Sequence, residues 1–186
     1  MSKSTNKSTN PEALKEQGNT YFTLGKFDQA IAFYSQAIDM AGDKPSHVYY
    51  GNRANAYLEL NELDKSIADC VEAIKLCPTY SKAYFRQGKA TIFKQDMKAG
   101  YALLEAGHQH DKTNTAIIEL MQQVKVLIDE DDKMPEDHPA RLMISNLFRW
   151  IESHGGKINS IRCRHYSETN RGLVASQDLK YGTAIL

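Results

Sequence analysis

The chain has 186 residues, of which 41% are hydrophobic, and its 23 basic side chains balance 23 acidic ones. This composition supports a buried core, and the zero net charge excludes both a general nucleic-acid polycation and a disordered acidic tail. Any recognition of charge must therefore be local.

The sequence carries no sign of membrane insertion or secretion. No apolar run approaches the roughly 18 residues of a membrane span, and the amino terminus lacks the apolar segment of a secretory signal. Cys70, Cys77 and Cys163 form no CxxC pair, which suits a reducing compartment and small buried packing roles. We expect a protein of the cytoplasm, and also of the nucleus, with no membrane and no nucleic-acid partner.

Structure is predicted to begin at residue 11. Residues 1–10 are almost wholly polar and predict a disordered head. Asn10 then precedes Pro11, and proline suits the first position of a helix because its missing N–H is not needed there.

Two kinds of helical stripe alternate after this start, which predicts three helical hairpins. The first helix of each hairpin shares a bulky, a small and a hydroxyl-bearing residue: Leu14, Gly18 and Tyr21; Tyr50, Ala54 and Tyr57; Tyr84, Gly88 and Thr91. The second helix carries a longer stripe, weaker in its third copy: Phe27, Ala30, Ile31, Tyr34, Ala37 and Ile38; Leu63, Ser66, Ile67, Cys70, Ala73 and Ile74; Met97, Gly100, Tyr101, Leu104, Gly107 and His108.

The three units recur at nearly constant spacing. Tyr50 and Tyr84 are 34 residues apart, whereas Leu14 precedes Tyr50 by 36 because the loop at residues 42–45 is longer. This pattern resembles the tetratricopeptide repeat, or TPR, over about residues 11–114. The resemblance implies a mainly all-α solenoid of three repeats, and small residues are expected where its helices cross closely.

The third unit departs from the repeat pattern, and another helical stripe follows it. The departures are at Thr91, Gly100, Gly107 and Lys112. The following stripe is formed by Ile117, Ile118, Met121, Val124 and Leu127, and it should cap the open end of the stack. We therefore place the TPR domain with its capping helix at residues 11–130 and an acidic linker at residues 131–138.

Five hydrogen-bond donors fall at aligned positions of the three first helices. They are Lys15, Asn19, Asn52, Lys82 and Arg86. Residues four apart on a helix point the same way, so each helix can present its donors together. Alone, Lys82 and Arg86 would be two solvated cations; as part of an aligned set they predict a ligand with more than one anionic oxygen, such as a terminal carboxylate beside an Asp side chain.

The segments LKEQGN (14–19), GNRANAY (51–57) and SKAYFRQGK (81–89) resemble the two-carboxylate clamp of chaperone-binding TPR domains. The resemblance implies that the same five donors hold the last Asp of a Glu-Glu-Val-Asp tail, through its side-chain and terminal carboxylates. Such tails end the cytosolic heat-shock chaperones of the seventy- and ninety-kilodalton classes. The implied function is a co-chaperone or adaptor module that binds these tails.

Four further residues should flank the same groove. Phe22 and Phe85 suit either the core or the aliphatic side chains of a ligand, and both possibilities stay open. Asn55 and Lys89 are polar residues on an exposed helix face, which also need no ligand to explain them. The choice between chaperones would depend on such flanking contacts.

The class of structure changes after the linker. Residues 140–156 predict a helix closed by Gly155 and Gly156, residues 161–165 alternate like a strand, and residues 172–186 indicate two short strands around residues 180–182. Residues 148–186 resemble the opening of a SET-domain methyltransferase, in which the segment here running Arg171, Gly172, Leu173 borders the S-adenosylmethionine pocket. We thus place an incomplete SET-like α/β segment at residues 139–186. The segment departs from the family pattern at Asn170, where many relatives have glycine.

No catalytic or metal site is predicted. The family's cofactor-binding Asn-His segment and active-site Tyr are missing from this sequence, and the six histidines show no metal-ligand spacing. We expect no enzyme activity and no cofactor for this chain; S-adenosylmethionine would enter only with a complete SET domain. Two alternatives stay open: the amino-terminal part of a longer TPR–SET protein methyltransferase, and a scaffold that uses the clamp for another acidic carboxyl terminus.

Overall fold

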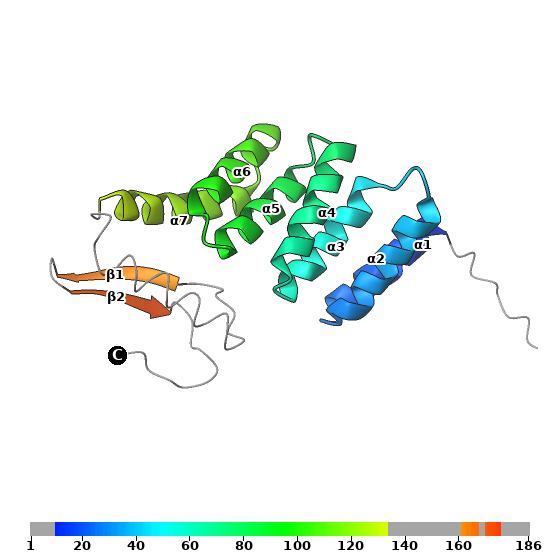
Figure 1. The fold of residues 1–186 in the computed structure, drawn as a ribbon, viewed down its shortest axis with the longest axis horizontal. Coiled ribbons are helices and arrows are strands. Elements are labelled where there is room, and N and C mark those ends of the chain that lie inside the picture. Colours follow the sequence, from blue (N-terminus) through cyan, green and yellow to red (C-terminus); the bar gives the residue numbers. More distant parts are fainter. Residues whose placement is uncertain (1–9, 134–160, 168–169, 176–186) are drawn as a thin grey trace, which may run out of the picture. The chain divides into compact units, whose positions relative to one another are not determined.

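The computed structural model describes residues 10–133, 161–167 and 170–175. The helices are α1 (Pro11–Thr23), α2 (Phe27–Ala41), α3 (His47–Glu59), α4 (Leu63–Leu76), α5 (Ser81–Phe93), α6 (Met97–His110) and α7 (Thr115–Asp132). Figure 1 shows α1 to α6 as three successive hairpins, each packed on the next. The three-hairpin solenoid predicted from the sequence is confirmed. Within the described ranges, no helix is both long and apolar enough to cross a membrane.

Local signals set the helix ends. Asn10 caps α1, because its Oδ1 accepts a hydrogen bond of 2.7 Å from the backbone N–H of Ala13, and Pro11 follows as predicted. The turn inside each hairpin places one residue in the left-handed region at the same repeat position: Gly25 (φ 71°), Asn61 (φ 60°) and Gln95 (φ 70°). Glycine and asparagine adopt this region readily, whereas Gln95 does so only because the hairpin around it imposes the turn.

The core runs from hairpin to hairpin. One buried cluster joins α1, α2 and α3 through Leu14, Ala37 and Tyr49, and another joins α3, α4 and α5 through Ala54, Cys70, Ala73 and Ala83. Alanines dominate because two helix backbones can approach closely only where side chains are small. The repeats therefore share one continuous core.

The third hairpin is complete although its second helix departs from the repeat pattern. The backbones of α5 and α6 approach so closely that a Cβ atom on Gly88 would lie 3.0 Å from the carbonyl oxygen of Gly100. The glycines that weakened the pattern in α6 thus permit this contact. Beyond it, Ile117 of α7 is fully buried next to Gly107, as expected of a cap.

A polar network ties the second helices together. The guanidinium of Arg53 on α3 donates two hydrogen bonds of 2.7 Å to the carboxylate of Asp69 on α4, and a third of 2.9 Å to Ser35 on α2. Asp69 is 6% exposed, so this bidentate pair is nearly dry. It fixes the relative positions of three helices from two hairpins.

The chain divides after Val124, and the second unit contains a β-hairpin. Strands β1 (Ile161–Ser167) and β2 (Asn170–Ala175) pair antiparallel, with Cys163 opposite Leu173 and an irregularity between His165 and Ser167. Strand β1 covers residues 161–165, where the sequence pattern predicted a strand. The predicted helix at 140–156 lies outside the described residues. Of the two strands predicted within residues 172–186, residues 172–175 belong to β2 and the rest lies outside the described residues. Helix α7 ends at Asp132, inside the segment predicted as a linker.

Replacing Gly18 by Ala should destabilise the first hairpin. The added Cβ would lie against the Tyr34 ring, only 2.6 Å from Cδ1. This overlap should outweigh the better helix propensity of alanine and lower the free energy of unfolding by about 1–3 kcal/mol, as measured by urea denaturation. The same substitution in a Tyr34→Leu background should cost clearly less, and equal costs in both backgrounds would contradict the explanation.

Candidate functional site

The five predicted donors lie on the first helices of the three hairpins. Lys15 and Asn19 are on α1, Asn52 is on α3, and Lys82 and Arg86 are on α5. Helix α3 contacts both α1 and α5, so these helices are neighbours in the stack. The alignment inferred from the sequence therefore holds at the level of the helices.

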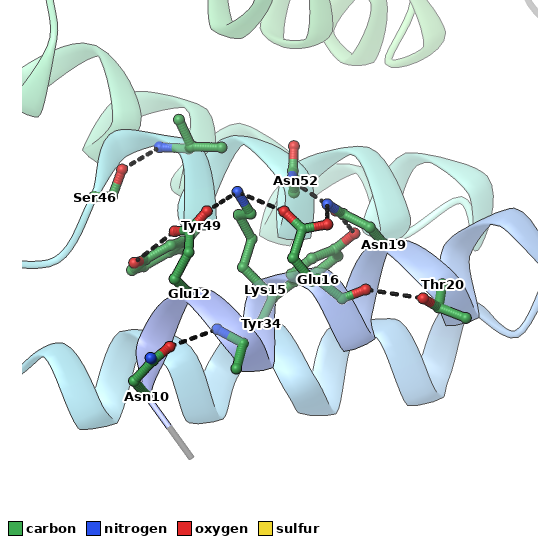
Figure 2. A network of polar contacts seen from close by, with 12 residues as sticks. Asn10, Glu12, Lys15, Glu16, Asn19, Thr20, Tyr34, Ser46, Tyr49 and Asn52 are labelled. Atoms are coloured by element: carbon green, nitrogen blue, oxygen red, sulfur yellow. Dashed lines mark hydrogen bonds and ion pairs between the residues drawn. The ribbon is translucent and has the colours of Figure 1, made fainter. Parts of the chain in front are cut away.

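Asn19 is the centre of the polar contacts between the first two hairpins (Figure 2). Its Oδ1 accepts a hydrogen bond of 2.9 Å from the Tyr34 hydroxyl and another of 3.0 Å from Nδ2 of Asn52. Its Nδ2 donates to Glu16 at 3.2 Å. The structure thus joins two of the predicted donors directly, and it adds Tyr34, which the core pattern of α2 had explained without any polar role.

A pocket of about 220 Å³ opens beside this contact. It is lined by Asn19, Phe22, Thr23, Tyr34, Asn52 and Asn55. Two of the flanking residues predicted from sequence, Phe22 and Asn55, therefore lie beside Asn19 and Asn52. Phe22 also packs edge-on against Phe27 at 5.3 Å, so it belongs to the pocket and to the edge of the core.

Lys15 is held by two carboxylates of its own helix. Its ammonium forms ion pairs with Glu12 and, at 2.9 Å, with Glu16. The hydrogen bond to Glu12, and then that to Glu16, raises the pKa of Lys15, while the hydrogen bond from Lys15 lowers the pKa of Glu16. The other oxygen of Glu12 accepts a hydrogen bond of 3.4 Å from Tyr49. Alignment of the donors in the sequence gave no signal for these two acidic partners, although the i, i+3 spacing of Glu12 and Lys15 could have shown one of the contacts.

Arg86 is partly buried against the second hairpin. Its Nη1 donates a hydrogen bond of 3.4 Å to the hydroxyl of Tyr80, and a Cβ on Gly51 would lie 3.0 Å from the same nitrogen. The side chain of Lys82, one turn earlier, is exposed. The two cations of α5 therefore have different surroundings, and among the described residues neither has an acidic partner.

The remaining predicted flanking residues are less tightly placed. Phe85 is half-buried on α5, and the ammonium of Lys89 lies 5.5 Å from the ring centre of Phe93 on the same helix. Neither residue lines the pocket beside Asn19. Their role in binding a ligand stays a prediction.

The described residues offer no other chemical site. They contain no cluster of histidine, cysteine, aspartate and glutamate that could hold a metal ion. Burial raises the pKa of the Cys70 thiol to about 12, which fits a packing residue. Arg171, Gly172 and Leu173 lie on β2, opposite His165, Arg164 and Cys163 respectively.

Three helical hairpins with aligned polar residues on their first helices define a helical repeat protein of the solenoid class. The model of the tetratricopeptide repeat family matches residues 11–43 and 47–80, which are the first two hairpins. The NMR structure of the first TPR domain of human RPAP3 is 30% identical, with a TM-score of 0.61, and the match covers 67% of this chain and 97% of that domain. The chain belongs to the tetratricopeptide repeat family.

Several solved relatives are peptide complexes. The first TPR of Spaghetti (RPAP3), bound to the HSP90 peptide SRMEEVD, is 29% identical with a TM-score of 0.61, and the match covers 64% of this chain and 94% of that domain. A complex of the TPR2B domain of yeast Sti1 with an Hsp70 peptide is 27% identical with a TM-score of 0.58, over 63% and 97% of the two chains. The TPR domain described here is thus homologous to domains that bind chaperone tails.

Curated relatives are longer proteins. Heat shock protein STI1 of Saccharomyces cerevisiae is 32% identical over 113 residues, which are 61% of this chain and 19% of that protein. Human RNA polymerase II-associated protein 3 is 36% identical over 176 residues, which cover 92% of this chain and 25% of that protein. The chain spans a quarter or less of the length of these two relatives.

Proposed function

We propose that this chain is a co-chaperone or adaptor module that binds the Glu-Glu-Val-Asp tails of heat-shock chaperones of the seventy- and ninety-kilodalton classes. The observation that carries the proposal is the hydrogen bond between Asn19 and Asn52, which brings donors from two hairpins together beside an open pocket. Homologous domains bind SRMEEVD and other chaperone peptides, which supports the choice of ligand.

The donors suit a chain end with two carboxylates. Asn19 and Asn52 each keep a second amide hydrogen beyond the contact described above, and these can meet a terminal carboxylate. Arg86 offers a planar fork to a carboxylate, and the exposed Lys82 offers a mobile point charge. Charge-assisted hydrogen bonds of this kind contribute about 1.5–3 kcal/mol each, enough to give a short peptide measurable affinity.

A peptide that ends in Met-Glu-Glu-Val-Asp should bind with a dissociation constant near 1 μM, which corresponds to about −8 kcal/mol. Amidation of its terminus should remove most of the affinity, and so should Lys82→Ala, because each change deletes a charge-assisted contact. Lys82 is exposed, so the variant should keep the wild-type melting temperature. Isothermal titration calorimetry measures the loss of affinity on amidation and on Lys82→Ala, with Lys112→Ala as the charge-matched control. Equal binding of the amide and the free acid would contradict the proposal.

The acidic pair beside Lys15 should weaken ligand binding. A peptide carboxylate would have to approach the Lys15 ammonium against the negative charges of Glu12 and Glu16, so Glu12→Gln should tighten the complex by about two- to fivefold. Glutamine keeps an oxygen that can accept the hydrogen bond from Tyr49. Glu105→Gln on α6 changes the net charge equally and should leave the affinity unchanged in the same titration. Unchanged affinity for Glu12→Gln would show that Glu12 does not oppose the ligand and would contradict this prediction.

A scaffold that captures a different acidic carboxyl terminus remains the nearest competing function. It would use the same donors, so a change of Lys82 cannot distinguish it from a chaperone-binding module. A competition experiment can distinguish them, because an intact ninety-kilodalton chaperone should displace the labelled peptide if its tail is the ligand. We further propose the cytoplasm, where these chaperones lie, and also the nucleus, as the place where the chain acts.

As a second candidate, we propose that residues 139–186 begin a SET-like unit of a longer methyltransferase. The pairing of β1 with β2, which contains Arg171, Gly172 and Leu173, favours it over an unstructured tail. This chain alone should bind no S-adenosylmethionine, because the Asn-His segment and the Tyr of that family are missing from its sequence. Equilibrium dialysis with labelled cofactor checks this, and saturable binding would show that residues 139–186 already form the pocket.

A further inference from the structure

We infer that Tyr34 is a positioning residue for the peptide-binding site: its hydroxyl holds Oδ1 of the Asn19 side-chain amide and so leaves Nδ2 to donate to a ligand. The inference rests on the proposed function. The hydroxyl donates to Asn19 Oδ1 at 2.9 Å, as Figure 2 shows. A carboxylate ligand needs the opposite end of that amide, because only Nδ2 can donate to it.

The fold places this hydroxyl by means of Gly18. Tyr34 is 2% exposed and packs with Ala30 and Ala56, on the inner side of α1. Its ring passes over Gly18 at a distance that leaves no room for a Cβ, and the hydroxyl emerges at the next residue, Asn19. A core residue of the second helix therefore reaches a binding residue of the first.

Tyr34 can hold Asn19 in a way that Asn52 cannot. Asn52 also donates to Asn19 Oδ1, but it is itself one of the donors proposed for the ligand, so its contact with Asn19 can change when peptide binds. Tyr34 also borders the pocket, but its ring is anchored in the core and is 2% exposed. Burial raises the pKa of Tyr34 to about 12, so the hydroxyl keeps its proton throughout the physiological range. It is therefore a permanent donor.

The amide orientation also explains the contact with Glu16. With Oδ1 engaged twice, Nδ2 is turned outward, where it donates to Glu16 at 3.2 Å in the free protein. A rotated amide would place Nδ2 against the Asn52 amide nitrogen, which also donates, and the Tyr34 hydroxyl would have to accept from Nδ2 and lose Oδ1 as the acceptor of its own proton. It would also leave an oxygen facing the incoming carboxylate. Both effects oppose binding.

The decisive variant is Tyr34→Phe, which removes one oxygen and keeps the ring over Gly18. Binding of a free-acid peptide ending in Met-Glu-Glu-Val-Asp should weaken about fivefold by calorimetry, the ratio that corresponds to loss of one hydrogen bond of ordinary strength. Tyr21→Phe is the matched control, since Tyr21 packs on the same cluster and stacks on Phe33 at 5.1 Å. It should bind like the wild type.

A double-mutant cycle separates positioning from packing or direct contact. If Tyr34 acts through Asn19, then Tyr34→Phe should have no further effect on affinity in an Asn19→Ala background. A fivefold loss that persists in that background, or a Tyr34→Phe protein that binds like Tyr21→Phe, would overturn the inference and leave the proposed function intact. A wild-type protein that binds free acid and amide equally would overturn the proposed function, and the inference with it.

Discussion

The two hydrogen bonds accepted by Oδ1 of Asn19 are the contact on which the site depends. One comes from Tyr34 in the core of the first hairpin, and the other from Asn52 at the start of the second. A single side chain therefore links core packing, the stacking of two repeats and the wall of the pocket. Since the hydroxyl and the two amides satisfy one another, the polar groups at this crossing carry little desolvation penalty.

Close helix crossing makes that contact possible. Gly18 lets the Tyr34 ring lie against α1. Gly51 likewise leaves room for Tyr80 and Arg86 against α3, since a Cβ there would lie 2.7 Å from the Tyr80 ring. In both cases a missing methyl group on a first helix admits an aromatic ring, whose hydroxyl then contacts a predicted donor. The small residues of the repeat thus determine the site as well as the packing.

The repeats and the helices that bear the donors could be predicted from the sequence, because both follow from periodic spacing. The sequence was not sufficient for the partners of those donors. The contact of Tyr34 with Asn19, and that of Asn52 with Asn19, depend on rotamers and on the rotation of one helix against another, which no spacing rule contains. The turn at Gln95 was missed for a related reason: its backbone conformation is imposed by the hairpin and not by the residue.

The charges of the site are distributed unequally, and this asymmetry follows from the contacts. Lys15 already forms ion pairs with two carboxylates, whereas Lys82 is exposed and Arg86 donates a hydrogen bond to the Tyr80 hydroxyl. Within the part of the chain that the structure describes, neither of these two cations of α5 is paired with a carboxylate. Electrostatic attraction for an anion should therefore come mainly from α5, while the pocket between α1 and α3 supplies neutral amide donors and shape. Two like charges four residues apart repel each other by about a few tenths of a kcal/mol, a cost that the proposed anionic ligand would remove.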